Sequence, residues 1–238
     1  MSDKKVFSFK QFDINQQNSA MKVGTDGVML GAWFSCSISE KILDVGTGTG
    51  LIALMLTQRC SATIDAIDID SGAIADALSN FENSPWSSRL TAIHSGFTQF
   101  VEATSKKYDG IVCNPPFFSH SLKPEHESRK LARHNDMLPF SELIKGAVKL
   151  LNYEGLLGVV LPANREQEFR HEAGLNGFFP VRITRVKPNA QKEVKRVLME
   201  FGFSEGGIQE NTLILETEVH NVYTDEYKKL VHSFYLNM

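Results

Sequence analysis

The sequence predicts an α/β protein with a doubly wound, mostly parallel sheet of seven strands. Short apolar runs alternate with longer stretches of helical periodicity, a pattern typical of a parallel sheet covered on both faces by helices. The first four expected strands lie at residues 41–45, 63–68, 89–94 and 108–113. Glycine-rich or polar residues follow these runs, and the carboxyl ends of parallel strands are where such sheets bind ligands.

The second half of the chain supplies the remaining three strands. A fifth strand is expected at residues 155–161, behind a helix at 140–150. Two more, at 181–187 and 196–201, flank a polar loop. This order of elements continues the alternation of the first half.

Residues 1–40 precede the first strand and are expected to form a cap segment that packs on a catalytic domain, residues 41–238. Helical or irregular structure is expected over 11–38. With 238 residues, of which 42% are apolar, the chain can bury one sizeable core. No stretch approaches the roughly 18 apolar residues of a membrane helix, and the N-terminus has no apolar signal-peptide core, so we expect a cytoplasmic protein.

A glycine-rich turn, D-V-G-T-G-T-G at 44–50, ends the first strand and precedes an apolar helical run. Its glycines, which let a backbone approach a ligand closely, are Gly46, Gly48 and Gly50. The dinucleotide-binding fingerprint requires a third glycine at position 51, where the chain has Leu51. Asp44 adds an anion that a pyrophosphate does not need. A carboxylate there suits a ligand with an ammonium group, such as the methionine part of S-adenosylmethionine.

The second strand ends on carboxylates. Asp68 lies 24 residues after Asp44, close to the spacing of about 20 at which an acidic residue binds ribose hydroxyls. We therefore predict Asp68 as a ribose ligand, with Ile69 packing on the attached adenine. Asp70 is expected to cap the helix at 73–80, although a shift of one register and a purely structural strand end both stay open.

The tetrapeptide Asn114-Pro115-Pro116-Phe117 follows the fourth strand. Prolines fix φ near −65° and have no N–H, so carbonyls in this turn are free to accept hydrogen bonds. The Asn114 side-chain oxygen adds a second acceptor, and together they can hold a planar amino group. Phe117 offers a ring for stacking, worth roughly 1–3 kcal/mol per base. The alternative is a Pro-Pro turn that merely ends a buried strand.

These motifs together resemble the class I S-adenosylmethionine-dependent methyltransferases that modify amino nitrogens, whose sheet ends in an antiparallel edge pair. The N-terminal stretch narrows the resemblance. Residues 7–12, Gln16 and A-M-K-V-G-T-D-G-V-M-L-G-A-W at 20–33 resemble the bacterial tRNA adenine-N6 methyltransferases that act on the adenine next to the anticodon of a valine tRNA. The resemblance covers roughly residues 6–203.

The resemblance implies a set of site residues. The methionine end of S-adenosylmethionine would contact Asp44, Gly46, Gly48 and Gly50, and Asp68 would bind its ribose. Thr25 and Asp26 would close over the methionine end, with Lys22 nearby, unless this stretch is only a turn before a helix. The target base would be held by Asn114, Pro115, Pro116 and Phe117. Many relatives place an acid after the third strand for the cofactor's adenine amino group, whereas this chain has Ser95 and Gly96, which leaves that contact to a backbone group or water.

The implied reaction is an in-line displacement at a sulfonium methyl group, so positioning supplies most of the rate acceleration. Acceptors on Asn114 and Pro115 would stabilise the positive charge that develops on the adenine amino nitrogen. No metal is expected, because His120, His126 and His134 with Cys113 match no common zinc spacing. The cysteines, Cys36, Cys60 and Cys113, are odd in number and read as small buried side chains without disulfides.

The formal net charge of −3 does not indicate a nucleic-acid-binding protein, but the basic residues are unevenly distributed. Residues 181–200 carry six basic side chains against two acidic ones, and the loop 120–136 carries four. We predict contacts with tRNA at 123–133 and 182–196, no membrane association and a monomeric protein. A solvated surface is the alternative for each single residue.

Other functions stay open at this point. Glutamine-N5 methyltransferases of release factors use a similar turn, commonly ending in Tyr, and rRNA or DNA adenine-N6 methylation would use the same chemistry. A DNA enzyme would call for a target-recognition insertion, and none of obvious size is present. An RNA-binding module with a vestigial cofactor pocket is the non-enzyme alternative. The intact glycines and acidic residues of the predicted cofactor site argue against this alternative. Stabilisation of the protein by the cofactor would distinguish an enzyme from such a module.

Overall fold

The computed structural model describes residues 5–115 and 138–238. Pro116, Phe117 and the whole basic loop expected at 120–136 therefore lie outside the described residues, as do His120, His126 and His134. Everything stated below about the structure concerns the described ranges.

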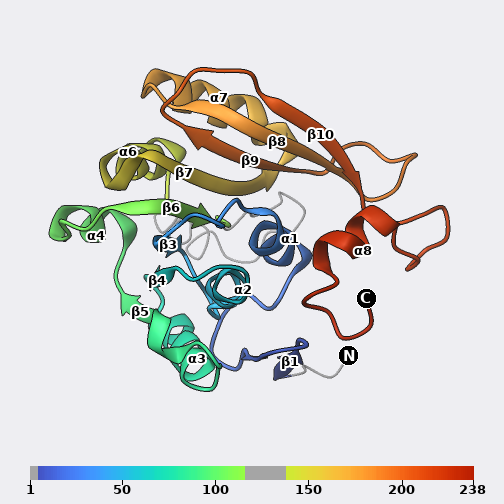
Figure 1. Ribbon diagram of the computed structural model, residues 1–238, viewed down its shortest axis with the longest axis horizontal. Helices are drawn as coiled ribbons and strands as arrows, with labels where there is room; N and C mark the ends of the chain where they lie inside the picture. The colour runs from blue at the N-terminus through green and yellow to red at the C-terminus, as the bar shows by residue number, and fades with distance from the viewer. Residues whose placement is uncertain (1–4, 116–137) are drawn as a thin grey trace, which may run out of the picture.

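An eight-stranded sheet forms the centre of the molecule, with the strand order β10-β8-β9-β7-β6-β3-β4-β5 (Figure 1). Its parallel core matches the expected positions closely. The strands are β3 (Lys41–Val45), β4 (Thr63–Asp68), β5 (Leu90–His94), β6 (Tyr108–Cys113), β7 (Leu151–Pro162), β8 (Phe179–Lys187), β9 (Arg196–Gly202) and β10 (Gln209–Ile214). The doubly wound α/β fold and all seven expected strands are thus confirmed.

The edge of the sheet differs from the expectation. β9 runs antiparallel to both β7 and β8, so the expected antiparallel pair is present. However, β10 pairs in parallel with β8 and makes an eighth strand at the edge. Four of its six residues are exposed, so it lacks the apolar run that marks the other strands.

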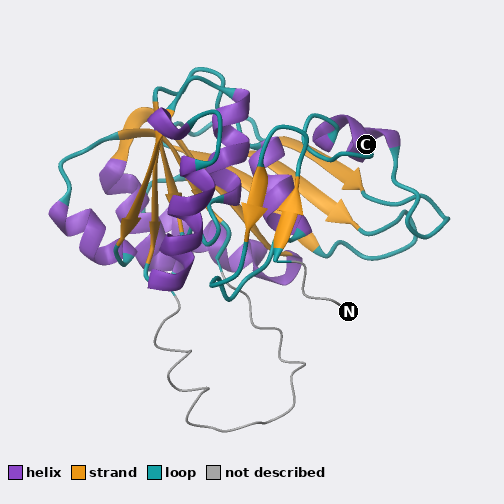
Figure 2. Ribbon diagram, turned by 90° about the horizontal axis from the view of Figure 1, so that it is seen from below, coloured by secondary structure: helices purple, strands orange, loops and turns teal. Residues whose placement is uncertain are grey.

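Helices cover both faces of the sheet (Figures 1 and 2). One face carries α1 (Thr25–Trp33), α2 (Leu51–Arg59), α3 (Ser71–Glu82) and α8 (Asp225–Val231), and the other carries α4 (Phe97–Ala103), α6 (Phe140–Leu150) and α7 (Glu166–Leu175). Neighbouring residues of one strand face opposite cores: Ile42 lies in the first and Leu43 in the second. This two-sided burial explains why the parallel strands read as continuous apolar runs.

The N-terminal region begins with a short antiparallel hairpin, β1 (Val6–Ser8) and β2 (Asp13–Asn15). The expectation of helical or irregular structure over 11–38 was therefore wrong for β2, a strand too short to give a periodic pattern. The amide of Lys10 donates to Phe234 O at 2.8 Å, and its ammonium to Met238 O at 2.8 Å, so the hairpin contacts the C-terminus. Seven of the nine α1 residues are buried, between α2, α8 and β7.

Among the described residues, none of the helices is both long enough and apolar enough to cross a membrane.

Candidate active site

A cavity of about 980 Å³ opens at the carboxyl ends of β3, β4, β5 and β6. Segments far apart in the sequence meet around it. They are residues 19–27, the glycine turn after β3, the end of β4, residues 95–99, Asn114 with Pro115, residues 138–142, and Arg196 at the start of β9. The cavity lies where the fold predicts a ligand, because the loops at this edge of a parallel sheet converge.

The three glycines of the turn have positive φ, 69° at Gly46, 56° at Gly48 and 81° at Gly50, a backbone conformation that other residues rarely adopt. Gly46 and Gly48 line the cavity, and a Cβ on either would meet no described atom within 4 Å. Both therefore leave open space for a ligand. Gly50 is not among the lining residues; a Cβ there would lie 2.4 Å from the Phe81 ring. Gly50 is thus required for packing of α2 on α3.

Asp44 lies fully buried beneath this turn. One carboxylate oxygen, Oδ2, accepts a 2.6 Å hydrogen bond from the Thr47 hydroxyl. The other, Oδ1, has no hydrogen-bond partner among the described residues. Burial raises the pKa of Asp44 to about 7, against the opposing effect of the Thr47 hydrogen bond. A buried carboxylate oxygen left unpaired beside a ligand cavity fits a ligand that carries a positive charge.

Asp68 closes the same turn from the neighbouring strand. Its Oδ2 accepts from the amide of Gly48 at 2.8 Å and its Oδ1 from the amide of Asp70 at 2.9 Å. Each oxygen keeps a lone pair that can accept from a ligand hydroxyl. Ile69 extends along the cavity wall and is 62% exposed. Asp70 caps α3 by accepting from the amide of Gly72 at 2.8 Å, as expected.

Asn114 and Pro115 follow β6 directly and line the cavity opposite the first turn of α1. The Asn114 amide nitrogen lies 3.8 Å from the position that a Cβ on Gly27 would take. The tighter contact of such a Cβ would be with Leu51 Cδ2, at 3.2 Å, and the Asn114 side chain would be in ordinary van der Waals contact. The turn that was expected to grip an amino group thus shares one cavity with the glycine turn expected to hold the methyl donor.

A segment of residues 15–22, here called the N-terminal strap, forms another wall of the cavity. The residues that hold this strap form no motif in the sequence. Asp76, buried within α3, accepts four hydrogen bonds from the strap, from the backbone amides and the side chains of Asn18 and Ser19, at 2.7–2.9 Å. Asn80, one turn further, accepts from the Asn15 amide and donates to the carbonyls of Asn15 and Thr49.

Three of the predicted cofactor ligands lie around the start of α1. Lys22 lines the cavity, but its ammonium group donates to the carbonyls of Gln16 and Ser19 and so closes the strap on itself. Asp26 lines the cavity and forms an ion pair with Arg196, with Oδ2 2.8 Å from Nε. Thr25 is the first residue of α1 and also lines the cavity.

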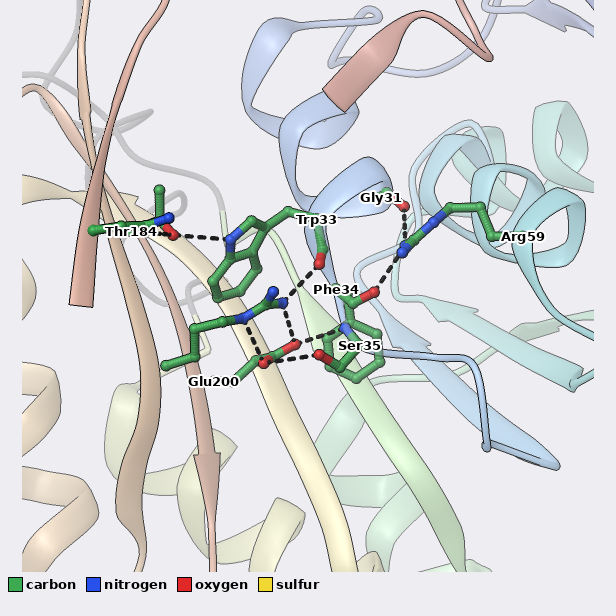
Figure 3. Close-up of polar contacts among 9 residues, drawn as sticks. Gly31, Trp33, Phe34, Ser35, Arg59, Thr184 and Glu200 are labelled. Carbon is green, nitrogen blue, oxygen red and sulfur yellow. Dashed lines mark hydrogen bonds and ion pairs between the residues drawn. The ribbon is translucent and has the colours of Figure 1, made fainter. Parts of the chain in front are cut away.

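The other end of α1 is fixed to the sheet by a polar network (Figure 3). The Arg182 guanidinium stacks 3.7 Å from the centre of the Trp33 ring and donates two hydrogen bonds of 2.9 Å to Glu200. Glu200, which is only 2% exposed, also accepts from the Ser35 amide at 2.6 Å. These contacts hold α1 in register with β8 and β9, and therefore hold its first turn at the cavity.

Two arginines of the segment predicted to contact RNA are paired within the protein. Arg182 is committed to Glu200, and Arg185 pairs with Glu166 at 2.7 Å and with Glu210 at 2.8 Å. By contrast, Lys192 and Lys195 are exposed and form no ion pair with a described residue. The usable positive charge of the segment 182–196 is therefore smaller than its sequence suggests.

Of the three cysteines, Cys113 lines the cavity. Cys36 and Cys113 are buried and Cys60 is half-buried at the end of α2, and all three are free thiols. In the ranges that the structure describes, no group of three or more His, Cys, Asp or Glu side chains converges as a metal site.

Comparisons with known proteins agree with this site. The model of the family described as "Methyltransferase small domain" matches residues 1–181. A protein of Flavobacterium psychrophilum named "tRNA1(Val) (adenine(37)-N6)-methyltransferase" is 49% identical over 98% of this chain and 100% of its own length. A protein of Trichodesmium erythraeum with the same name is 45% identical over 97% of each chain.

Solved structures show the same fold at low sequence identity. A predicted O-methyltransferase from Agrobacterium tumefaciens has a TM-score of 0.71 at 18% identity and covers 88% of this chain and 96% of its own. The glycopeptide N-methyltransferase MtfA, complexed with S-adenosyl-L-methionine, has a TM-score of 0.55 at 13% identity over 77% of this chain and 100% of its own.

The fold and the cavity therefore define a class I methyltransferase, an enzyme whose methyl donor is S-adenosylmethionine. Within this class, the chain belongs to the family of the tRNA1(Val) (adenine(37)-N6)-methyltransferases.

Proposed function

We propose that this chain transfers the methyl group of S-adenosylmethionine to the exocyclic N6 of an adenine in tRNA, at the position next to the anticodon of valine tRNA that its relatives' name specifies. One observation carries the proposal. Asn114 and Pro115, which offer acceptors for an amino group, and the glycine turn line a single cavity. The enzyme acts as a monomer in the cytoplasm, with residues 1–40 as a cap on the catalytic domain 41–238.

The methyl donor binds along the carboxyl ends of β3, β4 and β5. Its methionine end lies over Gly46 and Gly48, where the backbone is open, and its ammonium group is attracted by the buried charge of Asp44. Asp68 accepts from the ribose hydroxyls and Ile69 packs on the adenine. Lys22, Thr25 and Asp26 shape the wall above the methionine end, and Gly50 contributes by packing. S-adenosylmethionine supplies an electrophilic methyl group on a sulfonium.

The residues after β6 prepare the target nitrogen. An adenine amino group is a poor nucleophile because its lone pair is delocalised into the ring. Hydrogen bonds from this group to Asn114 Oδ1 and to the Pro115 carbonyl hold its lone pair toward the cavity and stabilise the positive charge that develops on the nitrogen. The proton then leaves to water. Pro116 and Phe117 complete the turn in the sequence and stay a prediction, because they lie outside the described residues.

RNA recognition requires positive charge around the cavity mouth. Lys192 and Lys195, which are exposed, flank the turn into β9, whose first residue, Arg196, lines the cavity. We propose Lys192 and Lys195 as phosphate contacts, together with the basic residues 123–133. Arg196 is left out because its charge is paired with Asp26. Arg182 and Arg185 are left out because their charges are paired within the protein.

The experiment compares Asn114→Ala with a matched control, Asn152→Ala. Asn152 lies near the opposite end of the sheet, where its amide donates to Asp109 at 2.7 Å. We expect Asn114→Ala to lower methyl transfer to a valine tRNA transcript by about 100-fold or more, as for loss of a transition-state hydrogen-bond donor or acceptor. Affinity for S-adenosylhomocysteine should change less than about threefold, and Asn152→Ala should behave as wild type.

Labelled methyl donor identifies the substrate in the same assay. Wild-type enzyme should label the transcript, and a transcript with guanine at position 37 should accept none. Label in a release factor but not in tRNA would overturn the proposal, as would near-normal turnover of Asn114→Ala.

A further inference from the structure

The end of the cavity beyond Ile69 contains an acceptor that the sequence did not reveal. A Cβ built on Gly96 would lie 3.6 Å from Ile69 Cδ1 and 3.7 Å from Gln99 Oε1. The apolar tip of Ile69 and the side-chain carbonyl of Gln99 therefore border the same small space above Gly96. All three residues line the cavity, and Gln99 is exposed to it.

A purine that packs on Ile69 brings its amino group to this space. The other polar side chains nearby already have partners. The Ser95 hydroxyl donates to the Gly96 carbonyl at 3.0 Å, Glu142 accepts from the Thr98 hydroxyl at 2.8 Å, and Asp68 accepts from two backbone amides. The Gln99 amide makes no hydrogen bond within the described part of the chain, so both its oxygen and its nitrogen are available to a ligand.

We propose that Gln99 is the residue that recognises the adenine of the methyl donor. Its Oε1 accepts a hydrogen bond from the adenine amino group, and its Nε2 donates to a neighbouring ring nitrogen. A carboxamide suits this edge because it offers one acceptor and one donor side by side, the pairing by which Asn and Gln read adenine in nucleic acids. Gln99 thereby supplies the hydrogen-bond acceptor that an acid after the third strand supplies in many relatives and that Gly96 does not. The inference rests on the proposed binding of the cofactor in this cavity.

The test is an equilibrium binding measurement by calorimetry. It uses S-adenosylhomocysteine and its deamino analogue, in which unsubstituted purine replaces adenine. Wild-type protein should prefer S-adenosylhomocysteine about five- to tenfold, the effect of the one neutral hydrogen bond that the deamino analogue cannot make. Gln99→Met keeps the length of the side chain but removes its amide, so it should lower this preference to near unity. The deamino analogue keeps the ring nitrogen, so in Gln99→Met it should lose only the Nε2 hydrogen bond and bind about two- to tenfold more weakly.

A rescue variant distinguishes recognition from a general effect on the cavity. Gly96 has φ −70° and ψ 149°, and a Cβ there meets only ordinary van der Waals contacts, so Asp fits at this position without strain. Gly96→Asp in the Gln99→Met background returns an acceptor to the same space and should restore the preference. Glu142→Gln is the control and should keep the wild-type preference.

Three outcomes would overturn the inference. They are an unchanged preference in Gln99→Met, loss of the preference in Glu142→Gln, and equal binding of both ligands by wild-type protein. In the last case the cofactor assignment stands and only the role of Gln99 fails. If wild-type protein bound neither ligand, the proposed cofactor site would fail with it. Thermal unfolding of the unliganded variants excludes misfolding as the cause, since Gln99 is exposed.

Discussion

Two buried carboxylates lie on either side of the glycine turn, and their surroundings are opposite. Asp76 is 1% exposed and accepts four hydrogen bonds from the N-terminal strap, which lower its pKa against the effect of burial. Asp44 is 0% exposed, accepts a hydrogen bond from Thr47 on Oδ2, has no hydrogen-bond partner among the described residues on Oδ1, and has its pKa raised to about 7 by burial. The protein itself supplies the hydrogen-bond donors that Asp76 needs, whereas one carboxylate oxygen of Asp44 has no donor among the described residues.

This difference separates structure from function in two carboxylates that are buried behind the lining of the cavity. A buried charge with all its partners stabilises the segment that provides them. A buried charge without partners costs free energy unless a ligand compensates it, so such groups are concentrated at binding sites. Asp76 should therefore govern stability and Asp44 should govern ligand affinity. Both effects can be measured separately.

The largest effect is expected from Asp76→Ala. The substitution leaves the donors of Asn18 and Ser19 without their acceptor, and hydrogen bonds to a charged group contribute about 1.5–3 kcal/mol each. We expect a loss of roughly 3 kcal/mol or more in the free energy of unfolding, measured with urea. Asp70→Ala, which removes an exposed cap from the same helix, should cost only about 1 kcal/mol. Equal losses in the two variants would show that the strap adds nothing to stability.

A smaller effect of a different kind is expected from Asp44→Asn. The neutral amide cannot attract an ammonium group, so affinity for S-adenosylhomocysteine should fall about 30-fold, or roughly 2 kcal/mol. The free energy of unfolding of the unliganded protein should not fall, because the substitution also removes an incompletely paired buried charge. Calorimetry and urea unfolding on the same preparation measure both. A variant that binds normally but unfolds easily would reverse the roles assigned to the two carboxylates.

The contrast also shows what sequence can predict. The strands 41–45, 63–68 and 108–113 and the helix 140–150 were located to the residue, because buried parallel strands and an amphipathic helix leave continuous local patterns. β10 and the hairpin β1–β2 were missed because they are short and largely exposed. Asp44 was recognised as a site residue because its environment is its own turn. Asp76 was not, because its partners lie 57–58 residues earlier in the chain.

The same reason explains the roles that the structure changes. Gly50 belongs to a motif that indicates ligand binding, but the contact that requires a glycine there comes from Phe81, on the next helix. Arg182 and Arg185 belong to a segment that is basic in the sequence. Their acidic partners come close only in the folded protein, and they are Glu166, Glu200 and Glu210. Gln99 lies in an ordinary helical turn, and its relation to Ile69 appears only in three dimensions. Local patterns identify elements and motifs, whereas tertiary pairing determines what each side chain does.

The last effect is a pH dependence that isolates Asp44, and it is small at any single pH step. Its pKa is raised in the folded protein, to about 7 from the ordinary value of 3.8, so the folded state holds a proton that the unfolded state has released between these values. Wild-type stability relative to Asp44→Asn should therefore fall as pH rises from about 4 to 7, with a slope of at most about 1.4 kcal/mol per pH unit, and level off above that range.

Asp76 contributes the opposite slope outside this window. Its pKa is lowered, so its contribution is present above the unfolded value and is lost as the pH falls through the folded value, equally in wild type and in Asp44→Asn. The difference in unfolding free energy between the two proteins, measured with urea across pH 4 to 8, therefore cancels the contribution of Asp76 and leaves that of Asp44. Saturating S-adenosylhomocysteine should weaken the decline, because its ammonium group favours the ionised carboxylate. A stability difference that stays flat across this range would mean that Asp44 is already compensated within the protein, and the distinction between the two carboxylates would disappear.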